Sequence, residues 1–161
     1  MALALLGNII WLFFGGWMVG LGYLLGAIVL FPLLPFLLPF ISYAFWPFGR
    51  RPVSKKAIRV YQELTFQPIF EDRFEKASAT VKFLANVVWG FTFGWVLALI
   101  HLICALMNLM ACLAIVTIPL TLPNVFAHIK LMPVALCPFG TRLVDSQLAD
   151  EIEVTYARSF L

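Results

Sequence analysis

Polar side chains that interrupt long apolar stretches are the sequence's only leads to chemistry. Their positions are Asn8, Asn86, His101, Asn108, Asn124, His128 and Lys130. An ionisable or strongly polar group at membrane depth is costly and therefore suggests a function. His101 and Asn108 are two helical turns apart and share a helix face, with Cys104 one turn from each. This strip either lines a pathway or hydrogen-bonds a neighbouring helix.

The basic pair His128 and Lys130 stands eight to ten residues before Pro138. On a helix, Lys130 is then close enough to the membrane surface to reach water or phosphate. It is either a basic anchor or takes part in anion or lipid passage. Asn8 and Asn86 each precede a tryptophan by three residues. We expect both to be structural helix caps, because asparagine is a good N-cap.

Enzyme chemistry finds no support in the sequence. No Ser-His-Asp arrangement or pair of carboxylates in a cleft is indicated, and every carboxylate lies outside the apolar blocks. The glycines do not follow a nucleotide-binding pattern. The three cysteines, Cys104, Cys112 and Cys137, lack metal-ligand spacing. We therefore expect a protein that is not an enzyme, with no metal, no cofactor and no nucleic-acid partner.

Composition defines the class of protein. The chain has 161 residues, of which 63% are hydrophobic and 12% charged. No acidic or basic side chain occurs in 1–49, and Lys130 is the only charged side chain in 83–141 when histidine is neutral. Each of these blocks exceeds 40 residues and is long enough for two helices of about 20 residues. The prediction is an all-α integral membrane protein with about four transmembrane or re-entrant helices.

The two apolar blocks open and close on matching motifs. Asn, Trp, Gly and Trp recur 78 positions apart, as Asn8, Trp11, Gly16 and Trp17 and as Asn86, Trp89, Gly94 and Trp95. Each block closes on a tag: Pro47, Phe48, Gly49 and Arg51 in the first, and Pro138, Phe139, Gly140 and Arg142 in the second. These motifs predict two hairpin repeats. If each hairpin crosses twice, the repeats are parallel, with an axis along the membrane normal.

The predicted organisation has four parts. Residues 1–53 form the first hairpin repeat, 54–82 a linker, 83–144 the second repeat and 145–161 a tail. Met1–Ala4 carries no basic side chain, so we expect the first block to be retained rather than cleaved. Five cations within 50–59 place the linker in the cytoplasm. Both termini are then cytoplasmic as well.

Within the repeats, some boundaries stay open. The first helix is expected over 5–30, with glycines at small-residue spacing that either pack against a helix or are merely tolerated. The return over 31–46 contains three prolines and either spans or is re-entrant. The second block crosses over 83–105, returns over 106–122 and adds a short helix over 124–137. Alternatively, one long helix reaches Thr117 and Pro119 begins the return.

The polar parts are predicted to be amphipathic helices. Ser54 caps a helix to about Leu64, and a second helix begins at Ile69. Asp145 or Ser146 caps an acidic helix in the tail. This tail helix packs either on the basic linker or on another subunit.

Together these motifs resemble the YccF family of bacterial inner-membrane proteins. The resemblance rests on the doubled tryptophan–glycine opening, Thr117-Ile118-Pro119, the 126–131 stretch and the closing Pro-Phe-Gly-x-Arg tag. It covers about 5–53 and 84–144. It implies a multi-pass protein with two copies of an inner membrane component domain and no assigned reaction.

Two functions fit these observations. The first is a channel or transport-related protein whose pathway is the His101/Asn108 strip. At 18.1 kDa the chain has little room for a pathway, so this function requires a homo-oligomer. The second is a non-catalytic component that supports a partner membrane protein or organises membrane lipid.

Overall fold

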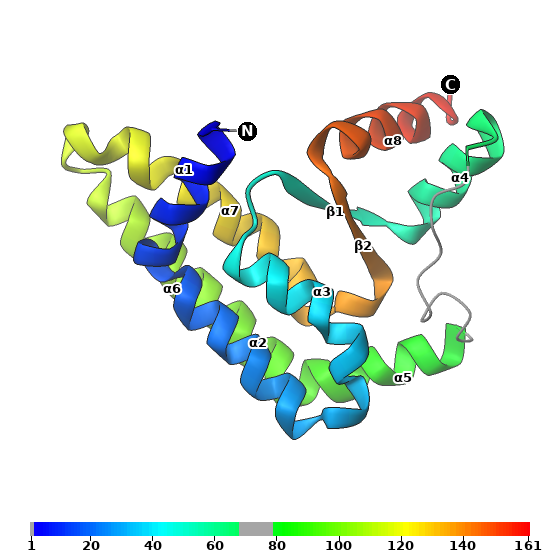
Figure 1. The fold of residues 1–161 in the computed structure, drawn as a ribbon, viewed down its shortest axis with the longest axis horizontal. Helices are drawn as coiled ribbons and strands as arrows, with labels where there is room; N and C mark the ends of the chain where they lie inside the picture. The colour runs from blue at the N-terminus through cyan, green and yellow to red at the C-terminus, as the bar shows by residue number, and fades with distance from the viewer. Residues whose placement is uncertain (1, 68–78) are drawn as a thin grey trace.

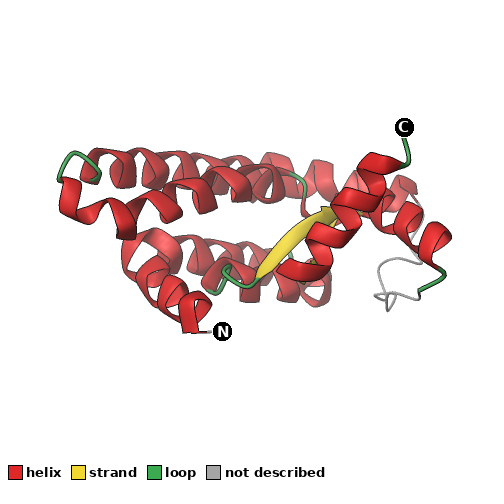
Figure 2. Ribbon diagram, turned by 90° about the horizontal axis from the view of Figure 1, so that it is seen from above, coloured by secondary structure: helices red, strands yellow, loops and turns green. Residues whose placement is uncertain are grey.

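Helices make up most of the molecule in this computed structural model, which describes residues 2–67 and 79–161. Three helices are long and apolar enough to cross a membrane: Leu3–Val29, Thr80–Ala111 and Ile115–Leu136. A shorter apolar helix covers Phe31–Phe45. Figures 1 and 2 show these helices packed side by side as a bundle. The predicted all-α membrane fold is confirmed.

The first hairpin has two arms of unequal length. Its first arm is α1 (Ala2–Trp11), a π-helical segment (Leu12–Gly16) and α2 (Trp17–Val29). A 3-10 turn (Phe31–Leu33) leads into α3 (Leu34–Phe45). Two of the three prolines fall in the first turn of a helical segment, where the missing N–H does no harm, and only Pro39 lies inside α3. The return segment is therefore a continuous helix.

The second hairpin is longer and has the same order of elements. It consists of α5 (Ala79–Trp89), a π-helical segment (Gly90–Gly94), α6 (Trp95–Ala111), a 3-10 turn (Ile115–Thr117) and α7 (Ile118–Leu136). Of the two predicted alternatives for this block, the one with a long first helix and a return that begins at Pro119 is closer to the structure. The prediction of a separate helix over 124–137 was wrong, because α7 continues through Pro123 and Pro133.

The relative direction of the hairpins differs from the expectation. Gly15 lies against Cys104, Gly22 against Leu97, and Gly26 against Phe93. Residue numbers rise along α2 while those of their partners fall along α6, so the two helices are antiparallel. In Figure 1 the first hairpin turn lies at the bottom and the second at the upper left.

The glycines explain why this antiparallel contact forms. A Cβ atom on Gly22 would lie 2.6 Å from the Leu97 side chain, so glycine lets the helices approach closely. These contacts confirm the packing role of the glycines. The antiparallel contact contradicts the predicted parallel hairpins with an axis along the membrane normal, because equal repeat spacing does not specify the relative direction of the hairpins.

A short antiparallel ribbon joins the two halves of the chain. Strand β1 (Arg50–Ser54) pairs with β2 (Thr141–Asp145), and Pro52 faces Leu143 at its centre. Neither strand was predicted. The strands lead into α4 (Lys55–Thr65) and α8 (Ser146–Arg158). We call 50–65 and 141–158 the cap, and Figure 1 shows its two helices together at the upper right.

Both cap helices begin at predicted residues. The Ser54 hydroxyl accepts a hydrogen bond from the Ala57 amide, and the Asp145 carboxylate accepts one from the Gln147 amide. The helix predicted from Ile69 lies largely outside the described residues.

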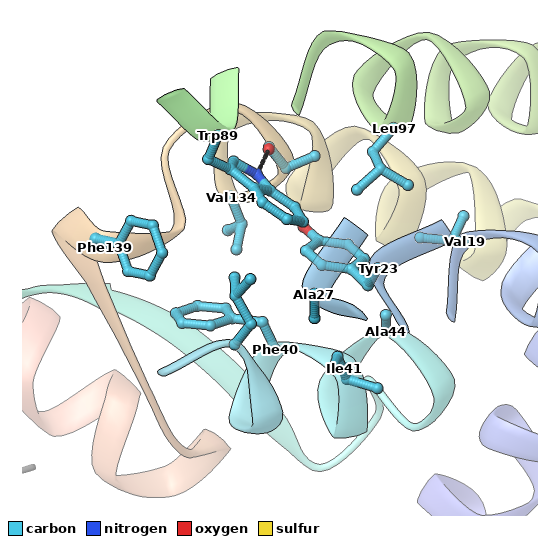
Figure 3. Packing of buried hydrophobic residues seen from close by; sticks show 12 residues of the cluster. Val19, Tyr23, Ala27, Phe40, Ile41, Ala44, Trp89, Leu97, Val134 and Phe139 are labelled. Atoms are coloured by element: carbon cyan, nitrogen blue, oxygen red, sulfur yellow. Dashed lines mark hydrogen bonds between the residues drawn. The ribbon is translucent and has the colours of Figure 1, made fainter. Parts of the chain in front are cut away.

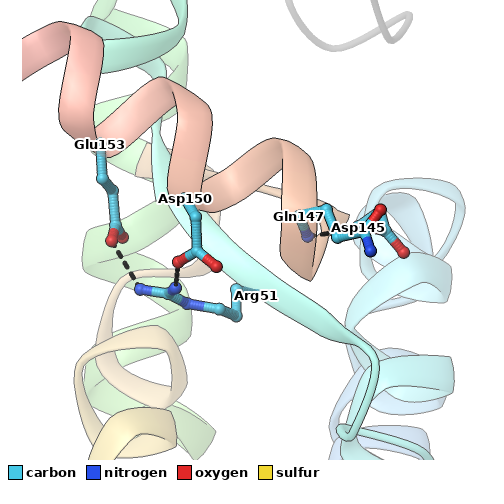
Figure 4. A network of polar contacts seen from close by, with 5 residues as sticks. All are labelled: Arg51, Asp145, Gln147, Asp150 and Glu153. Atoms are coloured by element: carbon cyan, nitrogen blue, oxygen red, sulfur yellow. Dashed lines mark hydrogen bonds and ion pairs between the residues drawn. The ribbon is translucent and has the colours of Figure 1, made fainter.

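The cap has a hydrophobic core and an ionic contact of its own. The core consists of Val53, Ala57, Ile58, Tyr61, Val144, Ala149 and Ile152. Arg51 binds both Asp150 and Glu153 of α8, as Figure 4 shows, with 2.5 Å between its guanidinium and Glu153. The acidic helix therefore packs on the basic linker, one of the two predicted alternatives.

The main core joins both hairpins. In Figure 3, Tyr23 of α2 and Trp89 of α5 lie together above Phe40 of α3, with Val134 of α7 beside them. The Tyr23 and Trp89 rings are stacked, with 5.6 Å between their centroids. Each hairpin thus buries its inner face against the other.

Candidate functional site

The repeated asparagines hold the closing tags in place. Asn8 Oδ1 accepts a hydrogen bond from the Phe48 amide at 2.8 Å, and Asn8 Nδ2 donates to the Phe48 carbonyl at 3.0 Å. Asn86 Oδ1 accepts from the Phe139 amide at 3.1 Å. The expected capping role was wrong, because both side chains reach across to the far end of their own hairpin.

The first tryptophan of each motif makes an equivalent bond. Trp11 Nε1 donates to the Ala44 carbonyl and Trp89 Nε1 to the Ala135 carbonyl, both at 2.8 Å. Gly16 and Gly94 lie directly against these indoles, where a Cβ atom would crowd the ring. The second tryptophans, Trp17 and Trp95, are exposed on the outside of the bundle.

The other tag residues shape the connections to the ribbon. Gly49 has φ +96°, a left-handed conformation that favours glycine. Pro47 and Pro138 are buried, whereas Gly140 has open space around it. Arg142 lies in β2 opposite Val53. These positions lie where the hairpins join the ribbon, and their structural role stays a prediction.

A backbone carbonyl in the first hairpin is the centre of a buried polar site. In the π-helical segment, Phe14 has φ −99° and ψ 27°, and Gly15 has φ +119°. This break frees the Phe14 carbonyl from the helix ladder. Asn108 Nδ2 donates to it at 3.1 Å and also to the Cys104 carbonyl at 2.8 Å. His128 Nε2 approaches the Phe14 carbonyl at 3.5 Å.

Two histidines continue this site across α6 and α7. His101 Nδ1 and His128 Nδ1 are 3.0 Å apart, so one of them donates. If His128 donates from Nε2 to Phe14, its Nδ1 accepts from His101. His101 Nε2 then becomes an acceptor, and neither it nor Asn108 Oδ1 has a partner within the described chain. The Trp11 ring covers His128, with 4.2 Å between centroids.

The five pathway candidates do not all belong to this site. His101, Asn108 and His128 come together in it and are buried. Asn124 is buried elsewhere on α7 and donates to the Leu120 carbonyl of its own helix at 3.1 Å. Lys130 is exposed and lines a separate cleft with Arg50 and Arg51.

Comparison with known proteins finds one family model and two curated relatives that resemble the chain. Residues 84–141 match the family model of YccF, described as an inner membrane component domain. The inner membrane protein YccF of Escherichia coli (strain K12) and that of Shigella flexneri are each 29% identical to the chain, over 94% of its length and of theirs. The chain is therefore similar to the YccF proteins along most of its length. No solved structure matches it.

The YccF domain match contains most of the buried site. It runs from α5 through α7 and includes His101, Asn108 and His128. The Phe14 carbonyl, which lies outside the match, was not predicted from the sequence, because every residue type has a backbone carbonyl. The neighbouring pair Gly15–Gly16 was the available signal. Among residues 2–67 and 79–161, no cluster of His, Cys, Asp or Glu is suited to a metal.

Proposed function

We propose that the protein is a non-catalytic component of the inner membrane that organises the lipid around it. Its hairpins lie in lipid and its cap lies in the cytoplasm. The observation that carries this proposal is the separation of charge. Among the described residues, every charged side chain except Lys82 and Lys130 belongs to the cap. A surface with such extended apolar areas is suited to lipid contact.

The hairpin turns support the same function. Phe31 in the first turn is 72% exposed and Val116 in the second is 89% exposed. The Thr117 hydroxyl donates to the carbonyls of Ala111 and Ala114. Side chains that bond the carbonyls at a helix break are what a turn in hydrocarbon requires.

The paired strands support one compartment for the cap. Because β1 precedes α4 and β2 precedes α8, the ribbon joins the start of the linker to the tail. Five cations between Arg50 and Arg59 favour the cytoplasmic side. The location of the cap in the cytoplasm is part of the proposal.

Retained lipid tests this function. The full-length protein is released from nanodiscs into native mass spectrometry, and bound phospholipid is counted as added mass. We expect one or more phospholipids to stay bound at activation energies that strip detergent. A protein that emerges free of lipid under those conditions refutes the proposal.

A transport-related role in an oligomer is the second candidate. The unpartnered acceptors His101 Nε2 and Asn108 Oδ1 favour it, because a buried acceptor is costly without a proton, a water or an ion. Reconstituted liposomes would then show ion flux that His101→Ala or Asn108→Ala alters. Absence of flux from a verified oligomer removes this candidate.

A further inference from the structure

A cleft of about 570 Å³ opens between the end of the first hairpin and α7. One wall comes from the first tag and the start of β1, with Tyr43, Arg50 and Arg51. The other wall is α7, with Phe126, Ile129 and Lys130. The cleft thus combines residues that are far apart in sequence and differ in chemical character. It is separate from the buried histidine site.

Three cations line the cleft. Arg50 is held in place, since its guanidinium donates to the carbonyls of Ser42 and Trp46 at 3.2 and 3.1 Å and lies 5.9 Å from the Tyr43 ring centroid. Arg51 is neutralised by its two carboxylate partners in α8. Lys130 contributes an exposed ammonium from the opposite wall. Arg50 and Lys130 therefore leave the cleft with excess positive charge.

The cleft lining also includes apolar side chains that are exposed. Phe126 is 60% exposed and Ile129 is 49% exposed on the outer face of α7. In a membrane protein such side chains contact acyl chains. Because Lys130 directly follows Ile129, the cationic and apolar parts are adjacent on one helix. This order of charge next to hydrocarbon matches a phospholipid, whose phosphate is covalently joined to its acyl chains.

We propose that this cleft binds an anionic phospholipid, with its phosphate between Arg50 and Lys130 and an acyl chain against Phe126 and Ile129. The inference rests on the proposed lipid-organising function and names the class of lipid. Cations near an anionic membrane surface contribute favourable binding energy individually. Losing the Lys130 charge is therefore expected to weaken binding about fivefold.

The test measures lipid affinity of the full-length protein in detergent by native mass spectrometry. The probes are phosphatidylglycerol, phosphatidylethanolamine and inorganic phosphate. Lys130→Gln removes the charge, Lys130→Arg retains it, and Arg59→Gln removes an exposed charge outside the cleft. We expect the wild type to bind phosphatidylglycerol more tightly than the other probes. Lys130→Arg and Arg59→Gln should bind phosphatidylglycerol as the wild type does, and Lys130→Gln should bind it about fivefold more weakly.

Each contrary outcome overturns the proposal in a distinct way. Equal affinity for the two phospholipids shows that the cleft does not select anionic lipid. An equal loss of phosphatidylglycerol affinity in Arg59→Gln and Lys130→Gln shows the same. In both cases the lipid-organising function still stands, provided that the protein retains lipid. Inorganic phosphate that displaces phosphatidylglycerol through Lys130 identifies a free-anion site. If no lipid binds at all, both this inference and the lipid-organising function fail.

Discussion

Gly15 shows how much one residue determines in the buried site. Its φ of +119° strains any residue with a side chain, and a Cβ atom there would lie 2.8 Å from Cys104 Sγ. The same conformation exposes the Phe14 carbonyl to Asn108. The glycine at position 15, the exposed Phe14 carbonyl and the Asn108 amide therefore depend on one another.

Gly15→Ala is expected to destabilise the protein by about 2 kcal/mol, because backbone strain and crowding combine. Thermal unfolding in detergent measures the change. Gly140→Ala is the matched control, since nothing lies within 4 Å of the added methyl group. Equal stability of the two variants would contradict the strain argument.

Asn108→Leu tests the amide itself. Removing the Nδ2 donor leaves the Phe14 carbonyl poorly bonded in a buried place. We expect a loss of about 1 kcal/mol in unfolding free energy, the usual scale for hydrogen bonds between membrane helices. Met107→Leu, the exposed neighbour on α6, should leave stability unchanged. A stable Asn108→Leu protein would show that the bond is dispensable.

At the scale of elements, the cap depends on one packed face of α8. Ile152 and Ala149 are fully buried against Val53 and α4, whereas Val154 is half exposed. The ion pairs of Arg51 lie at the surface, where such pairs contribute at most about 1 kcal/mol. Apolar packing, more than charge, therefore holds the linker and tail together.

Ile152→Ala should consequently loosen α8 from α4, at a cost of about 2–4 kcal/mol to the cap. Hydrogen exchange of the α8 amides gives a direct measurement, with faster exchange expected along 149–158. Val154→Ala on the same helix is the control and should exchange as the wild type does. Unchanged protection in Ile152→Ala would mean that other contacts hold the helix.

The sequence was informative for elements whose signal is local. Absence of charge, helix caps at Ser54 and Asp145, and proline positions located the helices. The strands were not predicted, because the sequence of 50–54 is typical of a polar linker. This segment becomes a strand only by pairing with 141–145, which is distant in the sequence. The histidine pair escaped for the same reason, since His101 and His128 meet only after α6 folds back on α7.

For the whole molecule, the turns determine how deeply the hairpins enter the membrane. Both turns carry exposed apolar side chains, Phe31 in the first and Ile115 and Val116 in the second, which suit hydrocarbon. In a variant without native cysteines, we expect Val116→Cys to resist an impermeant maleimide until detergent is added. Arg59→Cys in the cap should react once the cytoplasmic face is opened. Labelling of Val116→Cys from the outer face would place that turn in water.

The ribbon has a consequence for how the two halves of the chain assemble. Each half contributes one strand, and the pairing is symmetric about Pro52 and Leu143, which stand at matching places after their tags. Because this pairing joins the two halves, 1–67 and 68–161 produced as two polypeptides in one cell are expected to co-purify.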